Sequence, residues 1–315
     1  MYHRIATPAS DPWGLAVRPD RFAQQLELLK TYGEVVPLAR LGQGARGPRP
    51  QFALTFDDIC QDNLDKALPA LDRHGVPATM FAVSGAIGAG HDYWWDALAR
   101  AILETERLPA TLDLEVGAFR LHHDLGAAAT CPPGERAAIR CWRVEDRPPT
   151  HPRERLYWSL WQAIDAAPAE AREALCAAVL EWAGLPREVP EADRPLDEAG
   201  VHALAEGGLV EIGGHSMSHL PLDTLGPAAA SAEIEGCRSR LREVAGREVT
   251  SFSYPFGRFR PETAGLLRAA GFTQACDSRR GVAFAGIDRH HLPRIVVPEI
   301  DGEGLSALLQ SLVRA

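Results

Sequence analysis

Residues 51–83 read QFALTFDDICQDNLDKALPALDRHGVPATMFAV, and this stretch decides the fold class of the chain. The mostly apolar run 51–56 predicts a strand, which ends in the acidic pair Asp57-Asp58. Residues 63–74 have apolar side chains at helical spacing and therefore predict a helix. Residues 76–83, which are nearly all apolar, predict a second and buried strand. A strand, a helix and a strand in this order indicate an α/β protein with a parallel sheet covered by helices.

The same alternation returns in the C-terminal third of the chain. Together with short elements near the N-terminus it gives seven or eight strands, which is typical of a (β/α) barrel that need not be complete. Besides those in 51–83, the predicted strands are 1–5, 35–38, 209–212, 250–254, 272–276 and 295–297, and the predicted helices are 19–32, 228–245, 261–270 and 304–313.

A stretch of different character, about 88–195, interrupts this alternation. It contains six of the seven tryptophans and few strand signals, so we predict a mostly helical insertion. Because the preceding strand ends on the same side as Asp57, we expect the insertion to emerge on the active-site face and to set substrate choice. Tyr93, Trp94 and Trp95 lie near its start, where they either stack on a sugar ring or pack as anchors.

Composition narrows the class of protein further. The chain has 315 residues, 46% hydrophobic and 24% charged, which is ordinary for a globular protein. Its net charge of −9 excludes the bulk positive field of a nucleic-acid binder. No run approaches the roughly 20 apolar residues of a membrane span, and the first residues lack the apolar region of a signal peptide. These features predict a cytoplasmic protein. Its six scattered cysteines favour reduced thiols.

Two pairs of polar residues follow predicted strands, and their side chains can act together. Asp57 and Asp58 follow the strand 51–56, and His215 and His219 follow the strand 209–212. Four-residue spacing lets two imidazoles converge on one ion if the segment coils. With one of the two carboxylates, they form a His₂Asp set that leaves coordination positions open for water and substrate. Such a set is typical of a catalytic, zinc-like metal site.

A third group, Ser253-Tyr254-Pro255-Phe256-Gly257, also follows a predicted strand. A sharp turn there exposes backbone N–H groups, and an N–H aimed at the metal site could stabilise an oxyanion. The alternative is an ordinary strand-ending turn.

Three segments in this order, Thr55-Phe56-Asp57-Asp58, His215-Ser-x-x-His219 and Tyr254-Pro255-Phe256-Gly257, resemble the polysaccharide deacetylase family (NodB homology, carbohydrate esterase family four). The opening Tyr2-His3-Arg4-Ile5 and the late Leu292-Pro293-Arg294-Ile295 also resemble segments of its bacterial members. The resemblance spans about residues 1–85 and 205–300 and leaves the insertion out.

The resemblance implies a distorted (β/α)₇ barrel, with residues 1–315 as a single NodB-homology deacetylase domain that carries the insertion. It implies a hydrolase that removes the N-acetyl group from a sugar in a polysaccharide, a lipid-linked precursor or a small glycoside. Asp57 would be the general base, the N–H of Phe256 would line the oxyanion hole, and Asp58, His215 and His219 would hold one divalent metal ion. Zinc is the first expectation, with cobalt, nickel or manganese as alternatives.

The chain departs from the family pattern in three places. Ile59-Cys60 follows the two aspartates where the family has glycine and an aromatic residue. Cys60 would then be a stray ligand, an oxidation-sensitive thiol or a packed side chain. Ser253 stands where the family has an arginine, so Arg294 or Arg280 would orient Asp57 instead.

The Leu-x-His segment that supplies the family's general acid is also missing. The candidates to replace it are His3, His290 and His291, and we place His3 among the catalytic residues.

Two other functions remain open at this point. The metal site could hydrolyse another amide, such as an N-formyl group or a cyclic amide. The chain could instead be a degenerate sugar-binding protein that has lost turnover, although four intact motif residues, Asp57, Asp58, His215 and His219, argue against that. The predicted partner is an N-acetylated carbohydrate, with no nucleic acid and no membrane span, and the sequence leaves the oligomeric state open.

Overall fold

The computed structural model describes residues 1–43 and 49–313. It divides into two compact units. Unit 1 comprises residues 1–7, 16–89 and 195–315, and unit 2 comprises residues 8–15 and 90–194.

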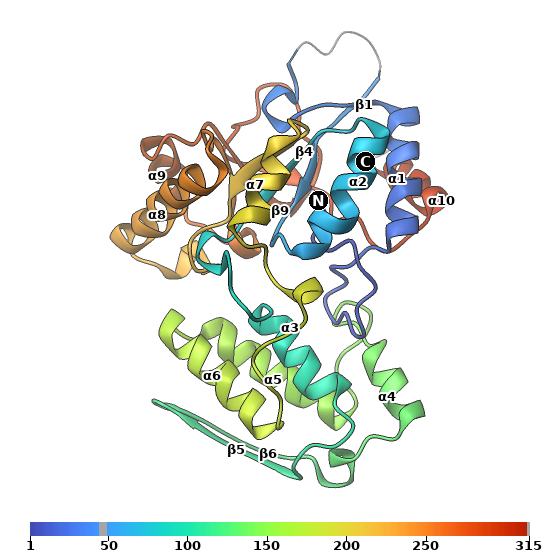
Figure 1. Ribbon diagram of the computed structural model, residues 1–315, viewed down its shortest axis with the longest axis vertical. Helices are drawn as coiled ribbons and strands as arrows, with labels where there is room; N and C mark the ends of the chain where they lie inside the picture. Colours follow the sequence, from blue (N-terminus) through green and yellow to red (C-terminus); the bar gives the residue numbers. More distant parts are fainter. Residues whose placement is uncertain (44–48, 314–315) are drawn as a thin grey trace. The chain divides into compact units, whose positions relative to one another are not determined.

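Unit 1 is built on one parallel sheet with helices around it (Figure 1). Six strands in the order β10-β9-β8-β7-β4-β3 form the sheet, which curls into a distorted, incomplete (β/α) barrel and so confirms the predicted fold class. The strands are β3 (Leu54–Phe56), β4 (Ala78–Ala82), β7 (Val210–Gly214), β8 (Ser251–Ser253), β9 (Gln274–Arg280) and β10 (Leu292–Arg294). The helices are α1 (Pro19–Tyr32), α2 (Leu68–His74), α7 (Glu198–Glu206), α8 (Pro227–Ala245), α9 (Thr263–Ala269) and α10 (Gly302–Val313).

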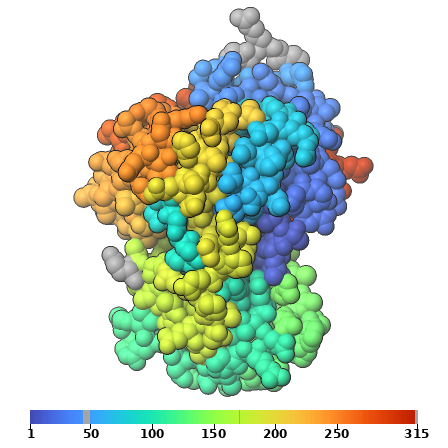
Figure 2. Space-filling view, in the orientation of Figure 1, coloured from blue at the N-terminus to red at the C-terminus, as the bar shows by residue number. Residues whose placement is uncertain are grey.

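The predicted helix 63–74 starts as the π-helical segment η2 (Asn63–Ala67) and continues as α2. On the surface of unit 1, α7 lies beside this segment (Figure 2). The apolar faces of the helices meet the sheet in one continuous core.

Several predicted strands differ from the observed ones. Residues 1–5 form two isolated bridges in place of a strand: Tyr2 pairs with Phe56 of β3, and Arg4 pairs with Ala16 outside the sheet. The predicted strand 35–38 is the short β1 (Glu34–Val35), which pairs with β2 (Gln51–Phe52) in a sheet of its own.

The predicted strand 295–297 is wrong, because the strand β10 ends at Arg294. The buried side chain of Arg294 donates through Nε to the carbonyl of Asp277 in β9, and Val296 beyond it is 45% exposed.

Unit 2 is mostly helical and has its own hydrophobic core. Unlike the predicted insertion, it includes residues 8–15 and contains an antiparallel hairpin. In the first strand of that hairpin, buried Leu112 and Leu114 alternate with exposed neighbours. Its main elements are α3 (Trp94–Ala99), η4 (Arg100–Glu104), β5 (Thr111–Val116), β6 (Phe119–Asp124), α4 (Pro133–Arg140), α5 (Pro152–Ala166) and α6 (Ala169–Trp182).

The aromatic residues at the start of the predicted insertion differ in burial. Tyr93 and Trp95 are buried, with ring centroids 4.7 Å apart and planes inclined by 5°. Trp94 is half-buried and meets Trp95 edge-on and Trp161 at a tilt. Burial and mutual stacking favour a packing role for Trp95.

We therefore expect Trp95→Ala to destabilise the protein by about 3–5 kcal/mol, the usual cost of removing a buried tryptophan. Chemical denaturation followed by circular dichroism measures this loss, with Trp94→Ala as the matched variant from the same helix. A raised KM for Trp95→Ala with unchanged stability would instead indicate a substrate-binding role.

Candidate active site

The predicted site residues come together at one edge of the parallel sheet in unit 1. Asp57 and Asp58 follow β3, and His215 follows β7. Ser253 ends β8 and Arg294 ends β10. Because all these strands are parallel, their carboxyl ends share one side of the sheet, which is where α/β proteins place their active sites.

Asp58, His215 and His219 form a compact, buried triad whose donor atoms all lie within 4.8 Å of one another. The Nε2 atoms of the two histidines are 3.2 Å apart. Oδ1 of Asp58 lies 3.2 Å from Nε2 of His219 and 3.5 Å from Nε2 of His215. The structure thus brings together the three residues predicted to bind a metal.

The hydrogen bonding of His215 prepares it as a ligand. Its Nδ1 donates to the backbone carbonyl of Ser253 at 2.7 Å, which leaves a lone pair on Nε2 directed at the triad. Burial lowers the pKa of His215, so the ring is neutral, as a metal ligand must be. A lone pair and a carboxylate oxygen facing each other at 3.5 Å repel unless a cation lies between them, so these residues fit a divalent metal ion.

Asp57 lies beside the triad and is held by an arginine from another strand. Nη1 and Nη2 of Arg294 donate to the two carboxylate oxygens of Asp57, each at 2.7 Å. The hydroxyl of Ser253 donates to Oδ2 of Asp57 at 3.0 Å, and Nη2 of Arg294 donates to that hydroxyl at 2.8 Å. Of the two arginines left open by the sequence, Arg294 orients Asp57, whereas Arg280 is exposed at the end of β9.

This environment sets the charge of Asp57. Burial alone would raise its pKa, but the paired guanidinium of Arg294 holds the pKa well below its usual range. The carboxylate is therefore ionised at neutral pH and can accept a proton. Its oxygen Oδ2 lies 3.9 Å from Nε2 of His215, so the proton acceptor and the triad are neighbours.

Backbone strain concentrates around these residues. Among the described residues, the non-glycine positions with positive φ are Asp58 (55°), Ser216 (61°), His219 (51°) and Phe256 (56°). All four belong to the three loops that the motifs predicted. Side chains other than Asn and Asp seldom adopt this region, and strain of this kind clusters at functional sites.

Phe256, the predicted oxyanion residue, lies in the turn that follows β8. Its ring packs edge-on against His219, with centroids 4.6 Å apart. This contact joins the third motif to the triad.

Of the three candidate histidines for the proton donor, the structure brings only His3 to the site. Desolvation lowers the pKa of His3 to about 4, and the charges of Asp57 and Arg294 also act on it. Nε2 of His290 instead donates to the carbonyl of Phe272, before the start of β9 and at the opposite end of the sheet. His291 packs against Phe259.

Asn63 and Cys60 stabilise the loop that follows Asp58. The amide of Asn63 joins two segments, because Oδ1 accepts from the N–H of Cys60 at 2.8 Å and Nδ2 donates to the carbonyl of His3 at 2.9 Å. The thiol of Cys60 is buried and faces the carbonyl of Asp58 at 3.3 Å, so it is packed rather than part of the triad. The sequence analysis missed the role of Asn63, although it is the polar residue that opens the predicted helix 63–74.

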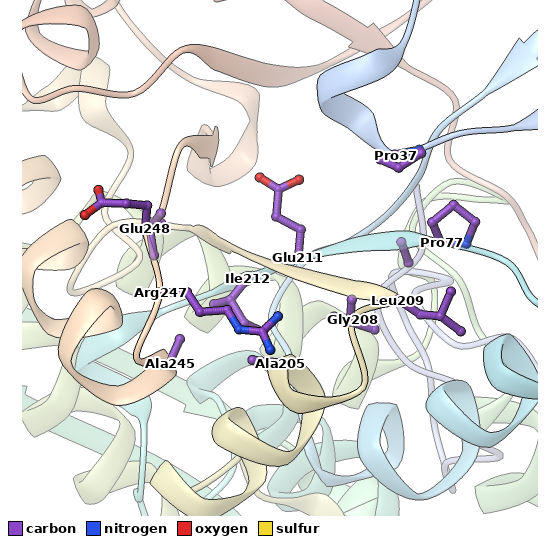
Figure 3. A pocket seen from close by; sticks show the side chains of 13 residues that line it. Pro37, Pro77, Ala205, Gly208, Leu209, Glu211, Ile212, Ala245, Arg247 and Glu248 are labelled. Atoms are coloured by element: carbon purple, nitrogen blue, oxygen red, sulfur yellow. The ribbon is translucent and has the colours of Figure 1, made fainter.

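A separate hollow of about 200 Å³ lies near the opposite ends of the strands (Figure 3). Pro77 and Leu209, which precede β4 and β7, are among the residues that line it. The carboxylate of Glu211 at its wall accepts hydrogen bonds from Thr79 and Ser251. These polar groups satisfy one another and lie away from the triad.

No helix within residues 1–43 and 49–313 has the length and apolar character needed to cross a membrane.

Comparison with known proteins finds similarity to the polysaccharide deacetylase family. The family model described as polysaccharide deacetylase matches residues 44–106 and 184–275. The curated protein YxkH of Bacillus subtilis (strain 168), whose name assigns it to the polysaccharide deacetylases, is 25% identical over 118 residues. That alignment covers 37% of this chain and 42% of YxkH, so the chain matches less than half the length of this relative.

Solved structures share the fold over nearly the whole chain. IcaB from Ammonifex degensii has a TM-score of 0.57 and 17% identity, covering 98% of this chain and 94% of its own. The Streptococcus pyogenes deacetylase PplD, solved in complex with acetate, has a TM-score of 0.55 and 16% identity, with 99% and 96% covered. BC0361, a polysaccharide deacetylase from Bacillus cereus, has a TM-score of 0.56 and 13% identity, with 98% and 66% covered.

Proposed function

We propose that this chain, which belongs to the polysaccharide deacetylase family, is a metal-dependent hydrolase that removes the N-acetyl group from an N-acetylated sugar. The observation that carries the proposal is the buried Asp58, His215 and His219 triad directly beside the arginine-held Asp57. A sugar-binding module that does no chemistry has no use for an open metal set next to an ionised carboxylate.

Asp58, His215 and His219 would hold one divalent ion, with zinc as the first candidate because imidazole and carboxylate donors suit it. When bound, such an ion supplies Lewis-acid activation of water and of the acetamide carbonyl. The protein's own contribution is to keep His215 neutral and oriented through the carbonyl of Ser253.

Asp57 is proposed as the general base that takes the proton of the attacking water. Arg294 and the hydroxyl of Ser253 fix both of its oxygens, so that its direction is set before the substrate arrives. The backbone N–H of Phe256 is proposed to stabilise the oxyanion that develops on the acetamide.

His3 is proposed to hand a proton to the departing amine. Desolvation lowers its pKa, so the ring is neutral in the free protein and has to take up a proton before it can donate one; the proton that Asp57 accepts from water is the proposed source. The water oxygen joins the acetyl carbon and the C–N bond breaks. One water proton passes to the amine nitrogen, and the other leaves on acetic acid, which ionises to acetate at neutral pH.

The test is acetate release from a panel of N-acetylated substrates, namely oligosaccharides, a monosaccharide glycoside and a lipid-linked sugar. We expect release from at least one of them, loss of release after treatment with a chelator, and recovery when Zn²⁺ is added back. Formate release from N-formyl analogues in place of acetate would favour hydrolysis of another amide. If the zinc-bound protein hydrolyses none of these substrates, the proposed function is wrong.

A further inference from the structure

The segment that links His215 to His219 is held by contacts from outside the motif. Both ends of this segment are metal-site residues in the proposed function, and Ser216 and His219 have positive φ angles of 61° and 51°. Strained backbone of this kind persists only where neighbouring structure fixes it. The groups that fix it therefore bear on the geometry of the triad.

On one side, the short helix η3 (Ser84–Ala86) after β4 supplies two donors. The N–H of Ser84 donates to the carbonyl of Ser216 at 3.1 Å, and the N–H of Gly85 donates to the carbonyl of Met217 at 2.9 Å. The approach at Gly85 is close, since a Cβ there would lie 2.5 Å from the carbonyl oxygen of Met217. Only glycine leaves room for this contact.

On the other side, the helix α8 supplies one carboxylate. Oε2 of Glu233 accepts hydrogen bonds from the N–H of Met217 at 2.8 Å and from the N–H of Ser218 at 2.9 Å. Gly236, one turn further along α8, lets the helix come close, because a Cβ there would lie 2.1 Å from Sδ of Met217. Hydrogen bonds to an ionised acceptor are about twice as strong as neutral ones.

We propose that Glu233 is a positioning residue for the metal site, which clamps the segment 216–218 against η3 and so presets the separation of His215 and His219. The inference rests on the metal assignment in the proposed function. Glu233 contacts two backbone amides of the segment and is 14 residues beyond His219 in the chain, so it acts through that backbone. Preset ligands bind a metal without first ordering the loop, and outer groups of this kind are typically worth 10- to 100-fold in metal affinity.

The experiment compares Glu233→Gln with Glu235→Gln in the full chain. Glu235 is exposed on the same helix and accepts a hydrogen bond from the hydroxyl of Ser231, one turn earlier, which makes it a matched control. Competition with a chelating dye measures the Kd for Zn²⁺. We expect it to rise about 10- to 100-fold for Glu233→Gln and to stay within twofold for Glu235→Gln.

Amide hydrogen exchange of the metal-free proteins supplies a second readout that needs neither zinc nor substrate. The amides of Met217 and Ser218 should exchange faster in Glu233→Gln than in the wild type or in Glu235→Gln. Glu233→Asp, which keeps the charge on a shorter side chain, should restore part of the affinity and slow the exchange again.

Unchanged zinc affinity and unchanged exchange in Glu233→Gln would overturn the clamp while leaving the proposed function intact. A wild type that binds no zinc would overturn the metal assignment and the clamp together. A deacetylation assay that fails while zinc binds tightly would count against the proposed function alone.

Discussion

Asp57→Asn is expected to bind zinc like the wild type and to lose at least about 10²-fold in kcat. Asparagine has nearly the same shape and can still accept from Arg294, but its amide cannot take up a proton at neutral pH. Asp57 lies outside the compact triad, so its replacement leaves the donor atoms of Asp58, His215 and His219 in place. The measurement pairs steady-state kinetics on the best acetylated substrate with metal content after dialysis.

A stability control is needed because the substitution also breaks a buried ion pair. It leaves the guanidinium of Arg294, which is only 7% exposed, without its counter-charge, and such a loss typically costs about 3–5 kcal/mol. The double variant Asp57→Asn/Arg294→Gln removes both charges, so we expect it to regain part of that stability without regaining turnover. Wild-type kcat in Asp57→Asn would show that the base lies elsewhere.

The sequence could not predict which of Arg294 and Arg280 contacts Asp57. The family resemblance implied an arginine where the chain has Ser253, and the sequence offered two replacements. Which of them meets Asp57 depends on the pairing of β9 with β10, where Arg294 lies opposite Arg280. Pairing across a sheet is a tertiary property, so no local pattern could decide it.

The motif residues themselves were predictable because parallel strands carry them to one edge. Asp57, Asp58 and His215 each follow a predicted strand, and the observed β3 and β7 end within two residues of the predicted ends. The hairpin formed by β5 and β6 has an apolar alternation, at Leu112, Leu114 and Val116 and again at Phe119 and Leu121, which the interpretation of this stretch as mostly helical passed over. The sequence does not predict the role of Glu233, because glutamates are common on amphipathic helices. Only the structure shows which backbone amides this one contacts.

His215→Ala and His219→Ala are expected to lose bound zinc, each weakening affinity by more than the roughly 10- to 100-fold typical of an outer contact. Each change removes one of the three donors and leaves the carboxylate of Asp58 facing a single imidazole. Asp58→Asn should lose affinity as well, which separates Asp58 from its neighbour Asp57, where only turnover is lost. Activity should fall to background in all three variants.

Thermal unfolding with and without zinc gives a readout of these variants that is independent of substrate. A ligand that binds only the folded state at 100 times its Kd stabilises that state by about 2.7 kcal/mol, so zinc should raise the Tm of the wild type. The same zinc should leave the Tm of His215→Ala and His219→Ala nearly unchanged. His202→Ala, which removes an exposed histidine of α7, is the matched control and should respond like the wild type. Because the two histidines and Asp58 are buried, their substitution also changes the stability of the metal-free protein. The test of zinc binding is therefore the change in Tm that zinc causes in each variant. Full zinc retention in both histidine variants would refute the triad.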